Sequence, residues 1–301
     1  MNRVIDPLFV NIVGGLGNQL FQYAIGRALA KKLGRPVQYC IDQISQYSSN
    51  RSFRLTEIFA ITASVALRTD LRNAVGALYA LPKARRALAQ DAYSWARPSR
   101  MVFENSTQFD ASIFDRCRSA KYLHGNWQSE RYFAEVAEVL RGELQFKMSK
   151  QVNDPALARI RSEPHSVAVH YRLGDYITNP KAARILGVQP VDYYKRAIAS
   201  LRAALPDARF FLFSDEPGRA RALLETEANV LESLPTHPGR TDHEELWLMT
   251  QCKHAIIANS SFSWWGAWLN SNAGKRVIAP NAWFANGEDS VDIVPIEWMR
   301  M

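Results

Sequence analysis

Short apolar runs alternate with helical patterns from the beginning of the chain. Residues 9–13 (FVNIV) form the first run and lead into a glycine turn at 14–17 (GGLG). After the turn, apolar residues recur at helical spacing and place six side chains on one face, namely Leu20, Phe21, Ala24, Ile25, Ala28 and Leu29. The pattern predicts a strand, a glycine turn and a helix.

The remainder of the first half is less regular. An alanine-rich stretch at about 66–92 predicts helix, and residues 122–133 (YLHGNWQSERYF) predict a strand, a Gly-Asn turn and a further helix. The polar stretch 147–155 (KMSKQVNDP) predicts a connection between two domains that ends at a helix start with Pro155.

The second half has a regular pattern. Four short apolar runs predict strands, at 166–170, 209–215, 254–261 and 276–280, with helical segments between them at 191–205, 216–227, 242–253 and 262–270. Thr241 and Glu244 have the spacing of a capping box at the start of one helix. This alternation predicts an α/β protein with a parallel, doubly wound sheet, and we expect domains at 1–155 and 156–301.

The composition is that of a globular protein. The chain has 301 residues, 47% hydrophobic and 22% charged, enough for two domains. Asp6 and Pro7 interrupt the N-terminus, so no signal peptide is expected, and no run of about 18 apolar residues occurs. Cys40, Cys117 and Cys252 are scattered and odd in number, which favours reduced thiols in a cytoplasmic protein.

The net charge of +8 indicates an anionic partner: nucleic acid, an anionic membrane surface or an acidic small molecule such as a nucleotide. Because zinc-finger, basic-zipper and RNA-recognition signatures are lacking, no nucleic-acid partner is expected. The densest basic positions, Arg85-Arg86 and 196–209, lie in helix-like segments and are interpreted mostly as solvated surface. No Asp-x-Asp, His-Glu-x-x-His or Cys-x-x-Cys pattern is present, so no metal is expected.

Polar residues follow each predicted strand of the second half. They are His170-Tyr171-Arg172, Ser214-Asp215-Glu216, Asn259-Ser260-Ser261 and Pro280-Asn281. In open parallel sheets, ligands bind outside the carboxyl ends of the strands. Turns use such residues too, and Asp215 is interpreted as a strand end. An arginine directly after a buried strand is less common, and the combination indicates a site.

The segment 170–176 (HYRLGDY) is the most informative. The planar guanidinium of Arg172 suits a diphosphate, and Gly174 allows the backbone to come close. The alternative is a structural pair in which Asp175 binds Arg172 and stabilises the turn. Spacing alone favours neither.

The segment 258–269 (ANSSFSWWGAWL) places small hydroxyl groups before a helix. The helix N–H groups, with Ser260 or Ser261, suit phosphate oxygens, whereas ordinary N-capping by a serine is the alternative. The tryptophans at 264, 265 and 268 share one helix face and are interpreted as core packing.

The opening glycine turn departs from the dinucleotide-binding fingerprint. Leu20 stands where the third glycine of that fingerprint is expected. Asp42 is roughly where a ribose-binding acid belongs, but the strand expected before it is weak. An NAD- or FAD-dependent oxidoreductase therefore remains an alternative with little support.

Six motifs together resemble the bacterial α-1,2-fucosyltransferases, which share a glycosyltransferase family with the animal blood-group enzymes. The motifs are GGLGNQLFQYAIGRALA, GNWQSERYF, HYRLGDY, FSD, LMTQCKHAIIANSSFSWWGAWLN and KRVIAPNAWF, and they span nearly the whole chain. The resemblance implies a GT-B-like fold, with two Rossmann-like domains whose parallel sheets face a cleft. It also implies a metal-independent, inverting transfer from GDP-L-fucose, without a cofactor.

The resemblance assigns residues to this cleft. Arg172 would bind the β-phosphate, His170 would lie near the guanine, and Asn259, Ser260, Ser261 and Phe262 would follow the nucleotide. Domain 156–301 would therefore bind GDP-fucose. Domain 1–155 would lie on the acceptor side, where Gly15 and Gly17 let the backbone approach the ligand and Asn18 faces the cleft.

Two positions depart from the family pattern, and the catalytic base is unassigned. Leu173 replaces the second arginine of the family motif, and Glu245 replaces an aspartate that accepts hydrogen bonds from guanine. An inverting transfer must remove a proton from the acceptor hydroxyl. Asp175 matches the motif's last aspartate, but it can equally brace Arg172, and a dissociative path would need no strong base.

These expectations add up to a galactoside α-1,2-fucosyltransferase. It would act on the 2-hydroxyl of a terminal β-galactoside, on the precursor of a surface polysaccharide. Alternatives are the oxidoreductase and a GDP-sugar-binding protein without turnover. If the precursor is lipid-linked, the positive charge would hold the enzyme at the inner face of the membrane.

Overall fold

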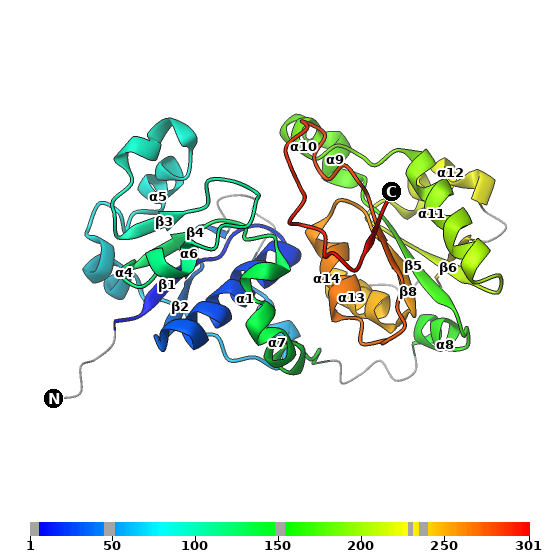
Figure 1. The fold of residues 1–301 in the computed structure, drawn as a ribbon, viewed down its shortest axis with the longest axis horizontal. Coiled ribbons are helices and arrows are strands. Elements are labelled where there is room, and N and C mark those ends of the chain that lie inside the picture. Colours follow the sequence, from blue (N-terminus) through cyan, green and yellow to red (C-terminus); the bar gives the residue numbers. More distant parts are fainter. Residues whose placement is uncertain (1–5, 45–51, 148–153, 228–230, 235–239) are drawn as a thin grey trace. The chain divides into compact units, whose positions relative to one another are not determined.

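The protein consists of two compact α/β units. The structure, a computed structural model, describes residues 6–44, 52–147, 154–227, 231–234 and 240–301 (Figure 1). The units comprise residues 1–147 and 148–301. The division therefore falls at 147/148, whereas the sequence pattern placed it after 155. Most of the expected connection, residues 148–153, lies outside the described residues.

Unit 1 is built on a parallel sheet. Its described strands are β1 (Leu8–Asn11), β2 (Val37–Cys40), β3 (Met101–Phe103) and β4 (Tyr122–His124), in the order β2-β1-β4-β3. Each pair is parallel, with Phe9 opposite both Gln38 and Tyr122. Ligands of such sheets bind where neighbouring connections diverge, which here is between β1 and β4.

The helices of unit 1 begin with α1 (Leu16–Leu33), which buries the apolar face predicted from its sequence and ends at Gly34 in the left-handed conformation. The others are α3 (Leu55–Ile58), α4 (Arg68–Val75), α5 (Pro82–Leu88), α6 (Ile113–Arg116) and α7 (Ala137–Glu143), with the 3₁₀ turns η1 (Asp91–Ala96), η2 (Glu130–Tyr132) and η3 (Ala134–Val136).

The alanine-rich stretch is not one continuous helical region. It forms α4, α5 and η1 as separate pieces. Gly76, with a φ of 94°, ends α4, and Pro82 begins α5. A left-handed glycine and a proline that lacks an N–H both interrupt helical hydrogen bonding, although the alanine content alone favours helix.

Unit 2 confirms the regular pattern of the second half. Its described strands are β5 (Ser166–Tyr171), β6 (Arg209–Ser214), β7 (Leu231–Ser233), β8 (His254–Ile256), β9 (Val277–Ala279) and β10 (Met299–Arg300), all parallel, in the order β10-β9-β8-β5-β6-β7. The helices are α8 (Pro155–Arg161), α9 (Gly174–Thr178), α10 (Pro180–Ile185), α11 (Val191–Ala204), α12 (Pro217–Leu223), α13 (Asp242–Gln251) and α14 (Ser261–Leu269), with the 3₁₀ turn η4 (Glu225–Glu227).

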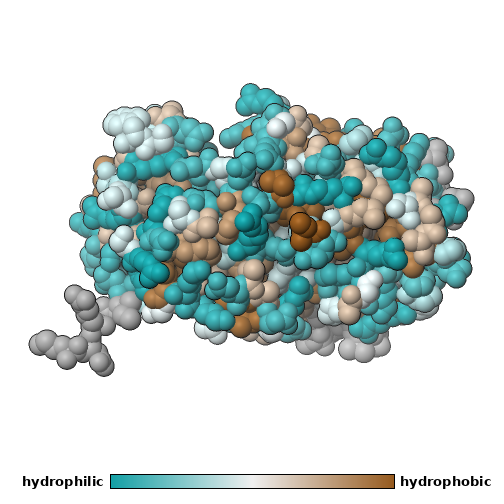
Figure 2. Space-filling model, viewed as in Figure 1, coloured by the Kyte–Doolittle hydropathy of each residue, from teal (hydrophilic) through white to brown (hydrophobic). Residues whose placement is uncertain are grey.

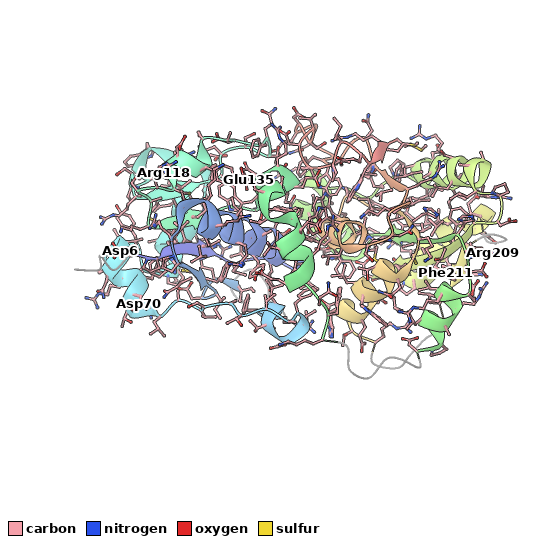
Figure 3. All side chains as sticks on the ribbon, turned by 60° about the horizontal axis from the view of Figure 1, so that its bottom comes forward. Asp6, Asp70, Arg118, Glu135, Arg209 and Phe211 are labelled. Carbon is pink, nitrogen blue, oxygen red and sulfur yellow. The ribbon has the colours of Figure 1, made fainter. Side chains whose placement is uncertain are left out.

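Several local predictions for unit 2 are confirmed. The Thr241 N–H donates to Glu244 Oε2 at 2.7 Å, which is half of the capping box at the start of α13. The tryptophans at 264, 265 and 268 are at most 3% exposed and pack on one another as core residues. On β6, which carries the Arg209 and Phe211 labelled in Figure 3, only the first residue is exposed.

The face of the molecule shown in Figure 2 is dominated by hydrophilic residues, and its hydrophobic residues form separate small patches. Within the described ranges, no helix has the length and apolar character needed to cross a membrane. Cys40, Cys117 and Cys252 are buried free thiols.

Candidate functional site

Arg172 and Asp215 lie at the carboxyl ends of two neighbouring strands of unit 2. Arg172 directly follows β5, and Asp215 directly follows β6. Parallel pairing brings these two ends to the same edge of the sheet, where Tyr171 is opposite Ser214. The site of unit 2 therefore begins with one cation and one carboxylate from different strands.

Two carboxylates hold the guanidinium of Arg172. Its Nε and Nη2 donate to Asp175 Oδ1 at 3.1 and 2.7 Å, and its Nη1 lies 3.2 Å from Asp215 Oδ2. The ring of Tyr176 lies 5.7 Å from the guanidinium carbon. The structural pair of Arg172 and Asp175 considered from the sequence is thus present.

The held guanidinium still reaches solvent. The exposed fraction of the Arg172 side chain is 29%, and two of its five N–H groups go to Asp175. Burial acts to lower the pKa of Arg172, but the charges of Asp215 and Asp175 outweigh it and raise the pKa. Arg172 is therefore a fixed cation with donors left for an anion.

Asp215 also fixes the backbone beside Arg172. Its Oδ1 accepts the N–H of Leu173 at 3.0 Å, and a Cβ on Gly174 would lie 2.3 Å from its Oδ2. The side chain of Leu173 is fully buried in the core of unit 2. Leu173 thus contributes only its N–H, and Asp215, interpreted from sequence as a strand end, contacts both the backbone and the arginine.

Ser260, Ser261 and Phe262 lie at the N-terminus of α14. Ser260 is the N-cap residue, yet no described side chain caps this helix, so the alternative of ordinary serine capping is not what the structure shows. The Tyr176 hydroxyl donates to the carbonyl of Asn259 at 2.9 Å. This bond ties the N-terminus of α14 to the Arg172 segment.

Asn259 was predicted only as a binding residue, but its side chain also has a structural role. Its side-chain NH₂ donates to the carbonyls of Leu186, Gly187 and Trp283 at 2.7, 3.2 and 2.9 Å. Its buried Oδ1 has no hydrogen-bond partner among the described residues. The Asn259 side chain therefore holds two loops in place and retains only an acceptor.

His170 lies on β5 beside Phe262, with ring centroids 5.7 Å apart. Burial, with a smaller contribution from the charge of Arg172, lowers the pKa of His170 to about 3, so its imidazole is neutral. Its buried Nδ1 lacks a hydrogen-bond partner within the described part of the chain. A buried polar atom without a partner is costly, which points to a ligand at this position.

Glu245 lies on α13 and is half-buried. Burial raises the pKa of its carboxyl to about 7, with Arg240 opposing and Asp242 and Asp215 adding to the increase. The neighbouring Glu244 serves the helix cap instead. The charge of Asp215 therefore acts on Glu245 as well as on Arg172.

In unit 1, Gly15, Gly17 and Asn18 lie after the carboxyl end of β1. Gln128 Nε2 donates to Asn18 Oδ1 at 2.9 Å, which joins the glycine turn to the segment after β4. Gly14 has a φ of 86°, and a Cβ on it would lie 2.7 Å from Asn18 Nδ2. Nothing described lies within 4 Å of a Cβ built on Gly15. These residues belong to unit 1, whereas the other predicted site residues belong to unit 2.

The segment after β4 is strained. Trp127 has a φ of 57°, which is unusual for a bulky residue. The Glu104 carboxylate accepts the N–H groups of Asn126 and Trp127 at 2.6 and 2.9 Å, and Gln22 Nε2 donates to the carbonyl of Gly125 at 3.0 Å. Strain of this kind persists where neighbouring contacts enforce it and clusters at functional sites.

Arg85 is a buried arginine that forms an ion pair with the exposed Asp42. Arg85 Nη2 lies 2.5 Å from Asp42 Oδ2, and the Arg85 side chain is completely buried. From the sequence, the segment of Arg85 is interpreted as solvated surface. For Arg85 this interpretation is wrong, because its side chain is buried. β2 is a regular strand, but the carboxylate that a dinucleotide ribose would need is bound to Arg85.

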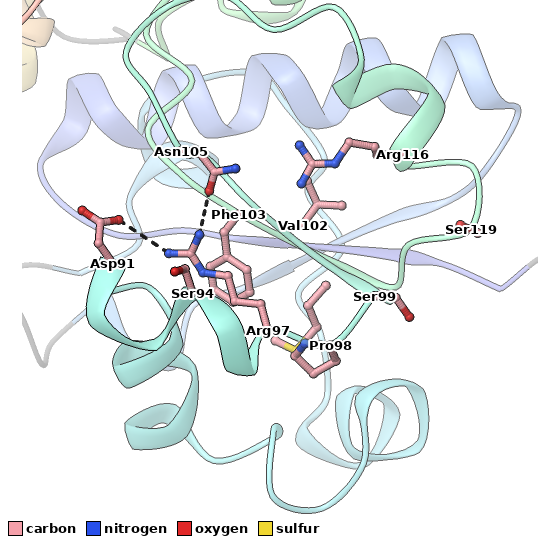
Figure 4. A pocket seen from close by; sticks show the side chains of 11 residues that line it. Asp91, Ser94, Arg97, Pro98, Ser99, Val102, Phe103, Asn105, Arg116 and Ser119 are labelled. Carbon is pink, nitrogen blue, oxygen red and sulfur yellow. Dashed lines mark hydrogen bonds and ion pairs between the residues drawn. The ribbon is translucent and has the colours of Figure 1, made fainter.

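A pocket of about 690 Å³ lies elsewhere in unit 1, against β3 and η1 (Figure 4). Arg97 dominates it, but its guanidinium already contacts Asn105 at 2.6 Å, Asp91 at 3.8 Å and the ring of Phe103. None of the site residues predicted from sequence lines it. The other arginine of the pocket, Arg116, pairs with Asp110 at 3.5 Å. Volume alone does not make this pocket the functional site.

No group of three or more His, Cys, Asp or Glu residues able to hold a metal occurs in the described ranges.

Comparison with known proteins gives one family. The model of glycosyl transferase family 11 matches residues 102–301. An alpha-1,2-colitosyltransferase of Escherichia coli is 31% identical over 295 residues, covering 96% of this chain and 97% of that protein. The O-antigen biosynthesis glycosyltransferase WbnK of Escherichia coli is 27% identical over 306 residues, covering 96% and 98%.

Comparison with solved structures gives the fold. A mutant of Arabidopsis thaliana FUT1 in complex with GDP has a TM-score of 0.51 and 10% identity, covering 91% of this chain and 70% of that chain. Together with the two parallel sheets, this likeness confirms the expected GT-B-like α/β fold.

The pKa of Glu245 predicts a pH-dependent stability. Its pKa is about 7 in the folded protein against an ordinary value of 4.5, so the folded state binds this proton more tightly. The associated stability is present at acidic pH and is lost as the pH rises from 4.5 to 7. Urea denaturation should therefore show Glu245→Gln and the wild type equally stable below pH 4.5, an advantage of the variant that grows as the pH rises from 4.5 to 7, and a constant advantage above pH 7. The exposed Glu297→Gln is the control, and a pH-independent difference would contradict the assignment.

Proposed function

This chain belongs to glycosyl transferase family 11, and from that membership we propose that it transfers L-fucose from GDP-L-fucose. The proposed acceptor is the 2-hydroxyl of a terminal β-galactoside on a surface polysaccharide precursor, with inversion at the anomeric carbon. The similarity to an alpha-1,2-colitosyltransferase and an O-antigen biosynthesis glycosyltransferase supports the linkage and the acceptor class.

The observation that carries this proposal is the position of Arg172 between Asp175 and Asp215, near the uncapped start of α14. The fixed guanidinium and the free helix N–H groups offer positive charge to a diphosphate without a metal. As the bond from the anomeric carbon to the β-phosphate oxygen breaks, negative charge grows on the departing GDP. Arg172 would stabilise that charge most in the transition state.

The nucleotide base would bind beside the same strand ends. His170 is neutral, and its Nδ1 lacks a partner among the described residues, so it can hydrogen-bond to a base beside Phe262. The ionised Glu245 would accept N–H groups of guanine, as the shorter aspartate of the family pattern does. Ser260 and Ser261 lie at the intervening helix start.

Asp175 would act on Arg172, since its Oδ1 accepts two hydrogen bonds from this guanidinium. We therefore propose Asp175 as a positioning residue. The proton of the acceptor hydroxyl would pass to solvent water late, after the bond to GDP has largely broken, so that a strong base is unnecessary.

A second candidate donor, GDP-colitose, is favoured by one observation, the 31% identity to the colitosyltransferase.

The donor and the linkage can be tested together. Purified protein should release GDP from GDP-L-fucose with β-galactosides, and NMR should show an α-1,2 linkage. If GDP-colitose is consumed and GDP-L-fucose is not, the donor assignment is wrong. Binding of GDP without turnover of either donor would favour a binding protein.

Arg172→Lys tests the phosphate contact. Lysine keeps the charge but loses the planar fork, so kcat with GDP-L-fucose should fall by about 10²–10³. The exposed Arg202→Lys on α11 is the matched control and should behave as wild type. Near-normal kcat in Arg172→Lys would refute the phosphate role.

Asp175→Asn separates positioning from base catalysis. Asparagine keeps an oxygen that accepts a hydrogen bond from Arg172. We therefore expect kcat of Asp175→Asn to fall by about tenfold or less, with an unchanged pH profile, and kcat of Asp175→Ala to fall further. Loss of a general base would instead lower kcat by about 10²–10⁴ and remove the acidic limb of the profile.

A further inference from the structure

Exposed hydrophobic side chains gather in one segment of unit 1. Twelve large hydrophobic residues of the described chain are exposed, and six of them lie between residues 65 and 95. These six are Val65, Leu67, Leu78, Leu81, Tyr93 and Trp95, with Trp95 83% and Leu67 65% exposed. Single exposed apolar residues are ordinary, but half of them in one short segment form a local surface.

The elements of this segment lie on the same part of unit 1. The inner residues of α4 and α5, Leu71, Val75 and Leu88, join one buried cluster with β1, β3 and β4. Leu67 and Pro82 line a common pocket, and Arg97, directly after η1, donates to the carbonyl of Leu88 at the end of α5. We call the outward side of α4, α5 and η1 the α4–η1 surface.

The α4–η1 surface is also positively charged. Residues 65–100 contain seven Lys or Arg and two Asp, which gives five of the chain's eight net positive charges. Arg85 and Arg97 point inward, and five cations are exposed, namely Arg68, Arg72, Lys83, Arg86 and Arg100. The two acids are Asp70, labelled in Figure 3, and Asp91, which pairs with Arg97 at 3.8 Å.

A second exposed apolar group has the opposite charge. Val291, Ile296 and Met299 are 58%, 94% and 51% exposed. Residues 288–297 beside them contain four acids and no Lys or Arg. Apolar exposure therefore occurs in both units, but the group at Val291, Ile296 and Met299 lies beside a predominantly acidic stretch.

We propose that the α4–η1 surface binds an anionic lipid bilayer. Basic side chains are attracted to anionic headgroups, while Trp and Tyr prefer the depth at which headgroups meet hydrocarbon. Exposed leucines between the cations supply further apolar area to bury. The net charge alone does not indicate where the protein would contact a membrane. The distribution of exposed apolar side chains indicates the α4–η1 surface. This inference holds whichever sugar the enzyme transfers.

Co-sedimentation of the full chain with vesicles tests the proposal. We expect binding to phosphatidylglycerol vesicles, weak binding to phosphatidylcholine vesicles, and loss of binding in 1 M salt, where screening acts within about 3 Å. Trp95→Ser, and separately Lys83→Glu with Arg86→Glu, should each lower partitioning by about tenfold. Circular dichroism checks folding, and turnover of a soluble acceptor should be unchanged, which keeps this test separate from that of the proposed function.

Two controls match these variants. Ile296→Ser removes an apolar residue that is 94% exposed, and Arg196→Glu with Arg202→Glu makes the same charge change on α11. Both should bind vesicles as wild type. Equal binding to the two lipids, no binding to either, or equal loss in the control charge pair would overturn the proposal. So would a dimer that dissociates in Trp95→Ser while vesicle binding persists, because the surface would then join two copies of the chain.

Discussion

The fixed guanidinium of Arg172 is the interaction on which the site of unit 2 depends. A charge that is seven-tenths buried needs anionic partners, and it finds them in Asp175, three residues later, and Asp215, at the end of the next strand. Asp215 also takes the N–H of Leu173 and leaves no room for a Cβ on Gly174. The backbone after β5 is therefore held from two sides, and the remaining donors of Arg172 have a fixed direction.

The other site residues of unit 2 differ in which hydrogen-bonding groups of their side chains remain available to a ligand. The NH₂ group of Asn259 donates its hydrogen bonds to two loops, whereas the buried Nδ1 of His170 has no partner in the described structure. Burial and nearby negative charge raise the pKa of the Glu245 carboxyl to about 7. An anionic nucleotide would suit this combination of groups. Its phosphates would accept hydrogen bonds from the arginine, and the polar edges of its base would pair with the buried atoms.

Much of unit 2 could be predicted from the sequence because its strands are short, buried and flanked by helices with clear signals, such as the capping box at Thr241. The place of Arg172 followed from the same pattern. The role of Asp215 did not, since it pairs with a segment 42 residues earlier, and spacing carries no information on such contacts. The break at Gly76 was missed because alanine content outweighed one glycine. In unit 1, the motif residue Asn18 was recognised, but its partner Gln128 and the strained Trp127 were visible only in three dimensions.

The central claim is that unit 2 holds a nucleotide diphosphate through Arg172. A crystal structure of the chain with GDP tests it most directly. The account predicts β-phosphate oxygens within hydrogen-bond distance of the Arg172 guanidinium and near the first N–H groups of α14, with the guanine beside His170 and Glu245. GDP bound at the glycine turn of unit 1, with Arg172 still engaged only by Asp175 and Asp215, would contradict it.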